Sequence, residues 1–122
     1  MKSVKITCIY CCPSYKKEIA RKTVKWCIKR LGLSKLKKLN IIVKIKSIED
    51  CYGYCEEINH KDRKYNIAIS NDQNLRYFVM TIIHEMTHVK QYVRNKWSGD
   101  GEREALINEE YLANELWKDN IL

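Results

Sequence analysis

Two histidines and a glutamate form the pattern in this sequence with the clearest chemistry. His84 and His88 stand four residues apart, and Glu85 directly follows the first of them. On a helix, side chains at this spacing project from the same face, so both imidazoles can bind one zinc ion at about 2.0–2.1 Å. Glu85 then lies beside the metal, where its carboxylate can take a proton from zinc-bound water. The pattern therefore predicts a hydrolytic zinc centre.

A zinc centre of this type also needs a third protein ligand and an open position for water. His60, the remaining histidine, lies in a polar turn and is expected to be exposed. The acids of the helix predicted after the motif are Glu102, Glu104, Glu109 and Glu110. If that helix returns antiparallel to the motif helix, it regains the level of the metal after roughly seven residues, near Glu109. A carboxylate in an apolar row is costly without a cation. We therefore expect Glu109 as the third ligand, with Glu110 and Glu104 as the alternatives.

The spacing of apolar residues predicts the elements that precede the motif. Alternation of apolar and polar residues predicts strands at residues 3–10, 41–45, 52–55 and 65–70. Residues 59–63 are a polar turn between the last two strands. Between the first two strands, apolar residues at helical spacing predict an amphipathic helix that starts at Pro13-Ser14 and stops at Gly32.

Two helices are predicted in the rest of the chain. Asn71 and Asp72 are expected to cap a long helix that carries the motif and runs to about Asn95. Its apolar stripe consists of Leu75, Phe78, Val79, Ile82, Ile83, Met86, Val89 and Val93. After a glycine-containing break, a last helix over residues 102–118 is expected to turn Leu106, Leu112, Ala113 and Leu116 inward. These elements predict a single α+β domain over residues 1–122, with an N-terminal helix and a sheet of three or four strands before the motif helix.

Composition limits the class of protein. The chain has 122 residues, of which 45% are hydrophobic and 31% charged, values that are ordinary for a folded domain. No apolar run approaches the length of a membrane span, and no membrane partner is expected. The N-terminus lacks the apolar segment of a secretory signal, so the cytoplasm is the expected compartment.

Charge is unevenly distributed along the chain. Residues 1–46 contain 14 Lys and Arg and one acid, Glu18, whereas residues 47–122 contain 9 Lys and Arg and 14 acids. A basic half of this kind could bind the phosphates of a nucleic acid or an acidic partner. The alternative is a compositional bias with lysines on solvated faces, since they are spread over several elements.

Six cysteines allow two interpretations. They are Cys8, Cys11, Cys12, Cys27, Cys51 and Cys55. Without a secretory signal, reduced thiols are expected rather than disulfides. The spacings Cys8-x-x-Cys11 and Cys51-x-x-x-Cys55 are also compatible with a second, four-thiolate zinc site.

The motif also carries a family resemblance. The run from Ile83 to Tyr92 is similar to the active-site helix of small phage and bacterial zinc metallopeptidase-like proteins, related to the SprT-like and other minimal gluzincin families. Gly53-Tyr54 and the run Glu109-Glu110-Tyr111 occupy places comparable to a Gly-Tyr strand and a Glu-containing later helix in those chains. The resemblance implies a zincin fold with His84, His88 and Glu109 as zinc ligands and Glu85 as catalytic base.

Together these features predict a zinc metallopeptidase that cleaves a protein or peptide substrate. The strand at residues 65–70 could pair with an extended substrate if it lies at the sheet edge near the metal. Tyr92 or Tyr111 could stabilise the oxyanion. The alternatives are a zinc-binding module associated with nucleic acid and a regulatory protein that keeps the zincin fold, with or without protease activity. Substrate, oligomeric state and metal specificity are left open by the sequence.

Overall fold

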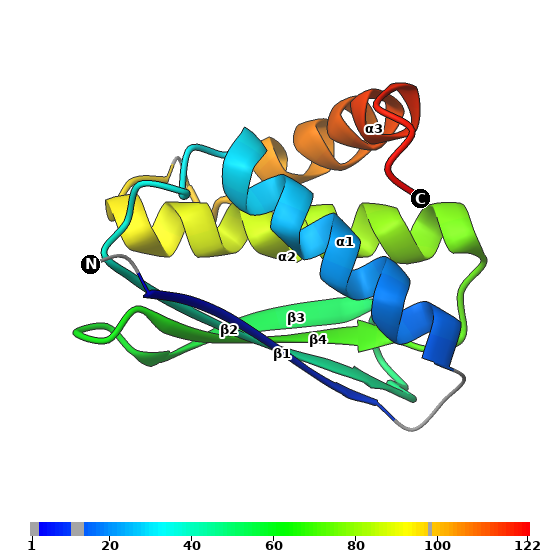
Figure 1. The fold of residues 1–122 in the computed structure, drawn as a ribbon, viewed down its shortest axis with the longest axis horizontal. Coiled ribbons are helices and arrows are strands. Elements are labelled where there is room, and N and C mark those ends of the chain that lie inside the picture. The colour runs from blue at the N-terminus through cyan, green and yellow to red at the C-terminus, as the bar shows by residue number, and fades with distance from the viewer. Residues whose placement is uncertain (1–2, 11–13, 98) are drawn as a thin grey trace.

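The computed structural model describes residues 3–10, 14–97 and 99–122 of the chain (Figure 1). Within these residues the chain forms, in order, strand β1 (Ser3–Tyr10), helix α1 (Ser14–Arg30), strands β2 (Lys38–Lys46), β3 (Gly53–Asn59) and β4 (Lys64–Ser70), and helices α2 (Leu75–Arg94) and α3 (Glu102–Lys118). The predicted α+β class is confirmed, and each predicted strand and helix is present. Among the described residues, no helix combines the length and the apolar character that crossing a membrane requires.

The four strands form one mixed sheet in the order β1-β2-β4-β3. β1, β2 and β4 run parallel, and β3 pairs antiparallel with β4. Pairing of residues 65–70 with a substrate required a position at the sheet edge, and this condition is not met, because β4 lies between β2 and β3. Its side chains from Tyr65 to Ser70 are all buried, as expected for a strand with neighbours on both sides. The edge strand on this side of the sheet is β3.

All three helices lie on the same side of the sheet, where α1 and α2 pack against its face and α3 packs against α2 (Figure 1). Along β2, alternate side chains are buried against the helices, namely Leu39, Ile41, Val43 and Ile45. The matching stripe of α2 is fully buried and consists of Phe78, Val79, Ile82, Ile83, Met86 and Val89. This stripe fixes the rotation of α2 about its own axis, and so decides which way the histidines of the same helix point.

Helix α2 starts three residues later than the predicted cap. The side chain of Asn74 accepts a hydrogen bond from the backbone N–H of Tyr77 at 3.0 Å, which makes Asn74 the N-cap. The backbone N–H of Asn71 instead bonds to Lys46 in the sheet, and that of Asp72 bonds to Ser70 Oγ. Asn71 and Asp72 therefore belong to the turn that leaves β4. Leu75 is exposed in the first turn of the helix.

Helix α3 returns antiparallel to α2. Arg76 near the start of α2 bonds to Asn114 near the end of α3, and Lys90 pairs with Glu104 near its start. The expectation that Leu106 points into the core is wrong, because its side chain is 56% exposed while Ala105 is fully buried. The inward face of α3 is formed by Ala105, Leu112, Ala113 and Leu116. In the first half of the helix, the buried residue is thus Ala105, one position before the predicted Leu106.

Candidate metal centre

His84 and His88 lie on α2 beside its buried stripe. Their side chains are 15% and 14% exposed, so they are neither in the core nor free in solvent. The two ring centroids are 5.0 Å apart, and the ring planes are inclined by 75°. The sequence predicted that both rings share one face of the helix, and the structure confirms it.

A carboxylate from the first turn of α3 meets both rings. Nε2 of His88 is 2.8 Å from Glu102 Oε1, and Nε2 of His84 is 3.2 Å from Glu102 Oε2. One donor atom from each of these three residues lies within 4.8 Å of the others, and such a group could hold a metal ion. Two imidazoles and a carboxylate are a known ligand set for catalytic zinc.

Glu109, the predicted third ligand, is not part of this cluster. Its Oε1 lies 3.6 Å from Nδ1 of His84, the ring nitrogen that faces away from Glu102. Glu109 therefore reaches the level of His84, as the length of the two helices predicted, but it faces the other ring nitrogen from Glu102. A carboxylate at the second nitrogen of a metal-binding histidine orients the ring and raises its basicity.

The two alternative third ligands lie elsewhere. Glu104 bonds to Lys90 and accepts a hydrogen bond from Gln91 at 2.9 Å, so its carboxylate is engaged outside the cluster. Glu110 is exposed on α3. His60 pairs with Glu57 at 3.0 Å and is exposed, as predicted.

Gln91 contacts Nδ1 of His88, the ring nitrogen that faces away from Glu102. It was not among the site residues predicted from the sequence. Its Oε1 lies 2.8 Å from Nδ1 of His88, and its Nε2 donates hydrogen bonds to Gly101 O and Glu104 Oε1. Because the amide nitrogen is committed to two acceptors, the amide oxygen faces the ring and can accept a hydrogen bond from Nδ1. With its proton on Nδ1, the ring would offer the lone pair of Nε2 to an ion held between the two rings and Glu102. Position 91 lies three residues after His88 on the same helix face, which is the signal that could have identified it.

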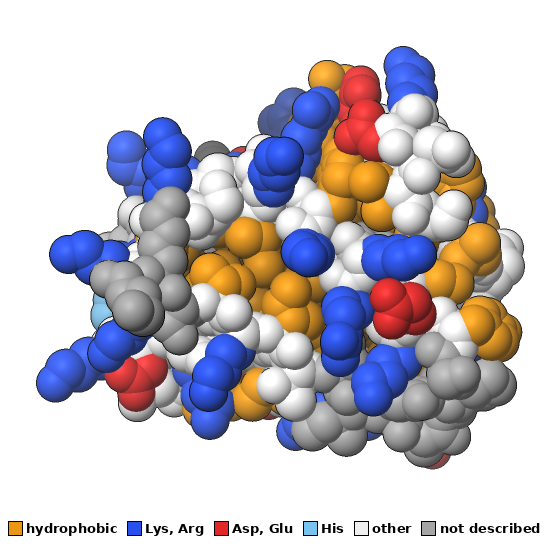
Figure 2. Space-filling model, in the orientation of Figure 1, with side chains coloured by type: hydrophobic (Ala, Val, Ile, Leu, Met, Phe, Trp, Pro, Cys, Tyr) orange, Lys and Arg blue, Asp and Glu red, His pale blue; other side chains and the backbone are white. Residues whose placement is uncertain are grey.

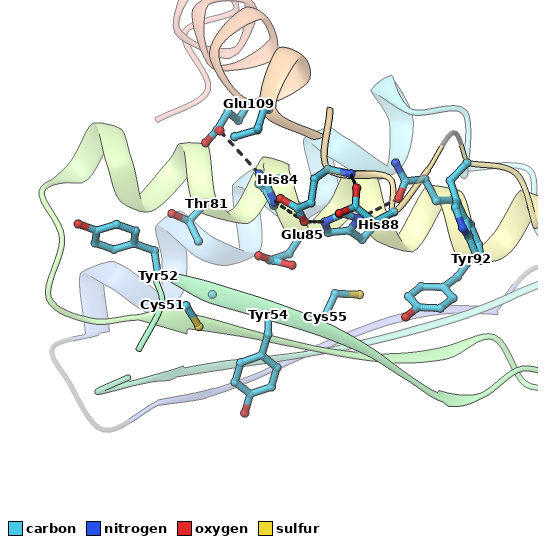
Figure 3. A pocket seen from close by; sticks show the side chains of 16 residues that line it. Cys51, Tyr52, Tyr54, Cys55, Thr81, His84, Glu85, His88, Tyr92 and Glu109 are labelled. Atoms are coloured by element: carbon cyan, nitrogen blue, oxygen red, sulfur yellow. Dashed lines mark hydrogen bonds and ion pairs between the residues drawn. The ribbon is translucent and has the colours of Figure 1, made fainter. Parts of the chain in front are cut away.

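Glu85 lies between α2 and the edge strand β3 (Figure 3). Its side chain is only 4% exposed. Burial raises the pKa of Glu85 to about 7, although His84 and His88 oppose this shift. A carboxylate with a pKa near neutrality is suited to exchange protons with a reacting group at physiological pH.

Gly53 lets β3 approach α2 at this point. A Cβ atom at residue 53 would lie 2.7 Å from both Ala68 O and Thr81 Cγ2, and 3.2 Å from Glu85 Oε2. Such contacts are too short for any other residue without a shift of the strand. The glycine therefore keeps the backbone of β3 directly beside the carboxylate of Glu85.

A cavity of about 660 Å³ opens over the cluster, between β3, α2 and the first half of α3 (Figure 3). His84, Glu85, His88 and Glu102 all line it. Its apolar and aromatic walls are formed by residues that include Tyr52, Tyr92, Trp97 and Leu106, so Leu106 lines the cavity rather than the core. The cluster is thus open to a molecule of peptide size rather than sealed.

The sequence suggested Tyr92 and Tyr111 as donors of a hydrogen bond to an oxyanion. Tyr92 lines the cavity, where its ring packs between Tyr65 and Trp97 at centroid distances of 5.9 and 5.7 Å. Tyr111 is exposed on α3 and does not line the cavity. Of the two, only Tyr92 lies where a bound molecule would meet it.

The structure describes the side chains of three of the six cysteines. Cys27, Cys51 and Cys55 are free thiols, and Cys51 and Cys55 line the cavity. Burial raises the pKa of Cys55 well above its usual range, so its thiol is protonated. Cys11, Cys12 and the side chain of Cys8 lie outside the described residues, and the second, four-thiolate zinc site stays a prediction.

Comparison with protein-family models, with curated proteins and with solved structures found no match for this chain.

Proposed function

We propose that this protein is a zinc-dependent metallopeptidase. The observation that carries the proposal is the convergence of His84 Nε2, His88 Nε2 and the Glu102 carboxylate, beside the buried Glu85, on the wall of an open cavity. Nitrogen and carboxylate donors on three residues suit zinc and leave a position for water. The sequence resemblance to minimal zincins supports the same assignment, as does the placement of the motif helix behind an edge strand.

His84, His88 and Glu102 are the proposed ligands. Glu109 and Gln91 hold the outer nitrogens of the two rings, so that each ring presents Nε2 inward. Zinc bound there would lower the pKa of its water and polarise the carbonyl group of a substrate.

Glu85 is the proposed general base. Its carboxylate accepts the proton of the attacking water and passes it to the amine that leaves when the peptide bond breaks. Burial raises the pKa of this carboxyl group, whereas a cation bound beside it would lower the pKa and keep the group ionised as a base. Burial between α2 and β3 holds the carboxylate in one place.

The edge strand β3 is the proposed binding site for the backbone of the substrate. A strand at a sheet edge has backbone N–H and C=O groups that no other strand of the sheet binds, and an extended peptide can pair with them. Gly53 brings this edge close to Glu85, so a peptide paired with β3 passes the cluster. This role replaces the one that the sequence assigned to residues 65–70.

Hydrolysis of a fluorescent-quenched casein by the zinc-loaded protein tests the proposal. Glu85→Gln should keep zinc but lose activity by about 100-fold or more, since general-base catalysis is typically worth about 10²–10⁴. Glu110→Gln, which removes an exposed carboxylate of α3, is the matched control and should remain active. Equal activity in the wild type and Glu85→Gln would exclude the proposed role.

A further inference from the structure

The outward face of α1 carries a row of cations (Figure 2). The cationic stripe is defined here as Arg21, Lys22, Lys25 and Lys29, all of which are exposed. Their helix neighbours Val24 and Cys27 are fully buried in the core. Side chains three and four residues apart are neighbours on a helix surface, and like charges so placed repel one another. Glu18, three and four residues before Arg21 and Lys22 on the same helix, offsets part of this repulsion, whereas Lys25 and Lys29 have no acid at that spacing on α1.

The protein itself supplies little compensation. Lys16, earlier on α1, bonds to the backbone and side chain of Asn71, and Arg30 lies 3.9 Å from Glu115. In contrast, within residues 3–10, 14–97 and 99–122 no carboxylate forms an ion pair with any member of the cationic stripe. The charges of the stripe are thus available to an external partner.

The stripe borders a groove between α1 and the C-terminal end of the chain. The groove has a volume of about 650 Å³ and is lined by Lys22, Lys25, Trp26, Lys29, Arg30, Asp119 and Ile121. Trp26 donates a hydrogen bond from Nε1 to Asp119 at 2.8 Å, and the guanidinium of Arg30 lies 5.7 Å from the centre of its ring. An indole ring is therefore held in place among cations.

We propose that this groove and the cationic stripe bind the sugar-phosphate backbone of a nucleic acid. Cations one helical turn apart, roughly 5 Å, can follow a regular line of phosphates, and such contacts dominate the affinity of nucleic-acid-binding proteins. An aromatic ring and an arginine beside the phosphates are the groups on which unpaired bases stack. This assigns the basic half of the sequence a binding surface.

An anionic membrane fits these observations less well. A helix that lies in a membrane surface inserts an apolar face, whereas the apolar face of α1 is buried against the sheet and α2. The cations of α1 also border a concave groove rather than a flat face.

The proposed surface is separate from the metal centre. The groove lies between α1 and the end of α3, whereas the metal-centre cavity lies between β3, α2 and the start of α3, and the two share no lining residue. Loss of one function should therefore leave the other measurable.

The test is the anisotropy of fluorescent 20-nucleotide single-stranded and duplex DNA titrated with the full chain at rising salt. The variant Lys22→Gln/Lys25→Gln/Lys29→Gln should weaken binding at least tenfold and reduce the slope of log affinity against log salt by about 2–3, since each lost phosphate contact contributes about 0.7–0.9. The control Lys37→Gln/Lys61→Gln/Lys96→Gln removes the same charge from exposed lysines elsewhere. It should bind nearly as the wild type does.

Three outcomes would overturn the proposal. Equal weakening by both triple variants would show an effect of net charge alone. Absence of binding to either DNA at about 50 mM salt, where phosphate contacts are strong, would remove the surface as a nucleic-acid site. Binding to phosphatidylglycerol vesicles or polyglutamate but not to DNA would assign the surface to a different anion. Circular dichroism of both triple variants checks that they are folded.

Discussion

Nδ1 of His88 lies 2.8 Å from Oε1 of Gln91, on the side of the ring that faces away from Glu102. The Gln91 amide is held by Gly101 and Glu104, both at the start of α3. Gly101 has a positive φ of 81°, and a side chain there would overlap Gln91. The backbone conformation at the start of α3 therefore positions the amide that faces Nδ1 of a histidine on α2.

The first prediction concerns this contact. Gln91→Leu should lower zinc affinity by about 10–100-fold, the usual cost of losing an outer partner of a metal-bound histidine. Competition with a fluorescent zinc chelator measures the change. Gln73→Leu is the matched control, since Gln73 bonds to Ser70 and Thr81, away from the cluster, and should leave zinc affinity unchanged.

The second prediction separates the two carboxylates around His84. Glu102→Gln should reduce zinc affinity more than Glu109→Gln does, because Glu102 faces both Nε2 atoms and Glu109 faces only the Nδ1 of His84. Elemental analysis after dialysis should show loss of zinc from the first variant and retention in the second. The opposite order would make Glu109 the ligand, as the sequence alone suggested.

The third prediction concerns the close approach of β3. Gly53→Ala should cost about 1–3 kcal/mol of unfolding free energy, as overpacking of a filled site does. Hydrolysis should fall by about 10–100-fold, because displacement of Glu85 or of the edge strand misaligns the reacting groups. Zinc affinity should change little, since no ligand is on β3. Ile58→Ala, at an exposed position of the same strand, should behave nearly as the wild type does.

The fourth prediction concerns alkaline pH. Burial raises the pKa of the Cys27 and Cys55 thiols above their usual value of 9.0. The unfolded chain releases these protons near pH 9 while the folded chain keeps them, so the free energy of unfolding falls as pH rises above 9. Each thiol contributes about 1.4 kcal/mol per pH unit in that range.

Urea denaturation at pH 7.5, 9 and 10 measures this fall. Cys27→Ala should be less stable than the wild type at pH 7.5 but should lose less stability between pH 9 and 10. Cys51→Ala, which removes an exposed thiol, should keep the wild-type dependence. An identical pH dependence in all three proteins would contradict the assignment to Cys27.

The sequence predicted the elements well because their signals are local. Helical spacing around Ile82 and Met86 and alternation along β2 depend only on neighbouring residues. The paired histidines and Glu85 were found for the same reason, since one turn of one helix defines them.

What the sequence missed depends on contacts between elements. The position of β4 inside the sheet follows from strand order, which no single strand encodes. The positions of Glu102 and Glu109 around His84 depend on which ring nitrogen each acid reaches across the α2–α3 interface. Gln91 matters only because Gly101 and Glu104 hold its amide from another helix.

Glu102 stands in the first turn of α3 while both rings that it meets are on α2. An ion bound there would link α2 to α3, which the chain connects only through residues 95–101. The free energy of binding the ion would add to the folding free energy of this part of the chain. Without the ion, the first turn of α3 would lose this link to α2, fray and become open to proteases. If the proposed site is filled in the cell, the abundance of the protein would then follow the supply of the metal.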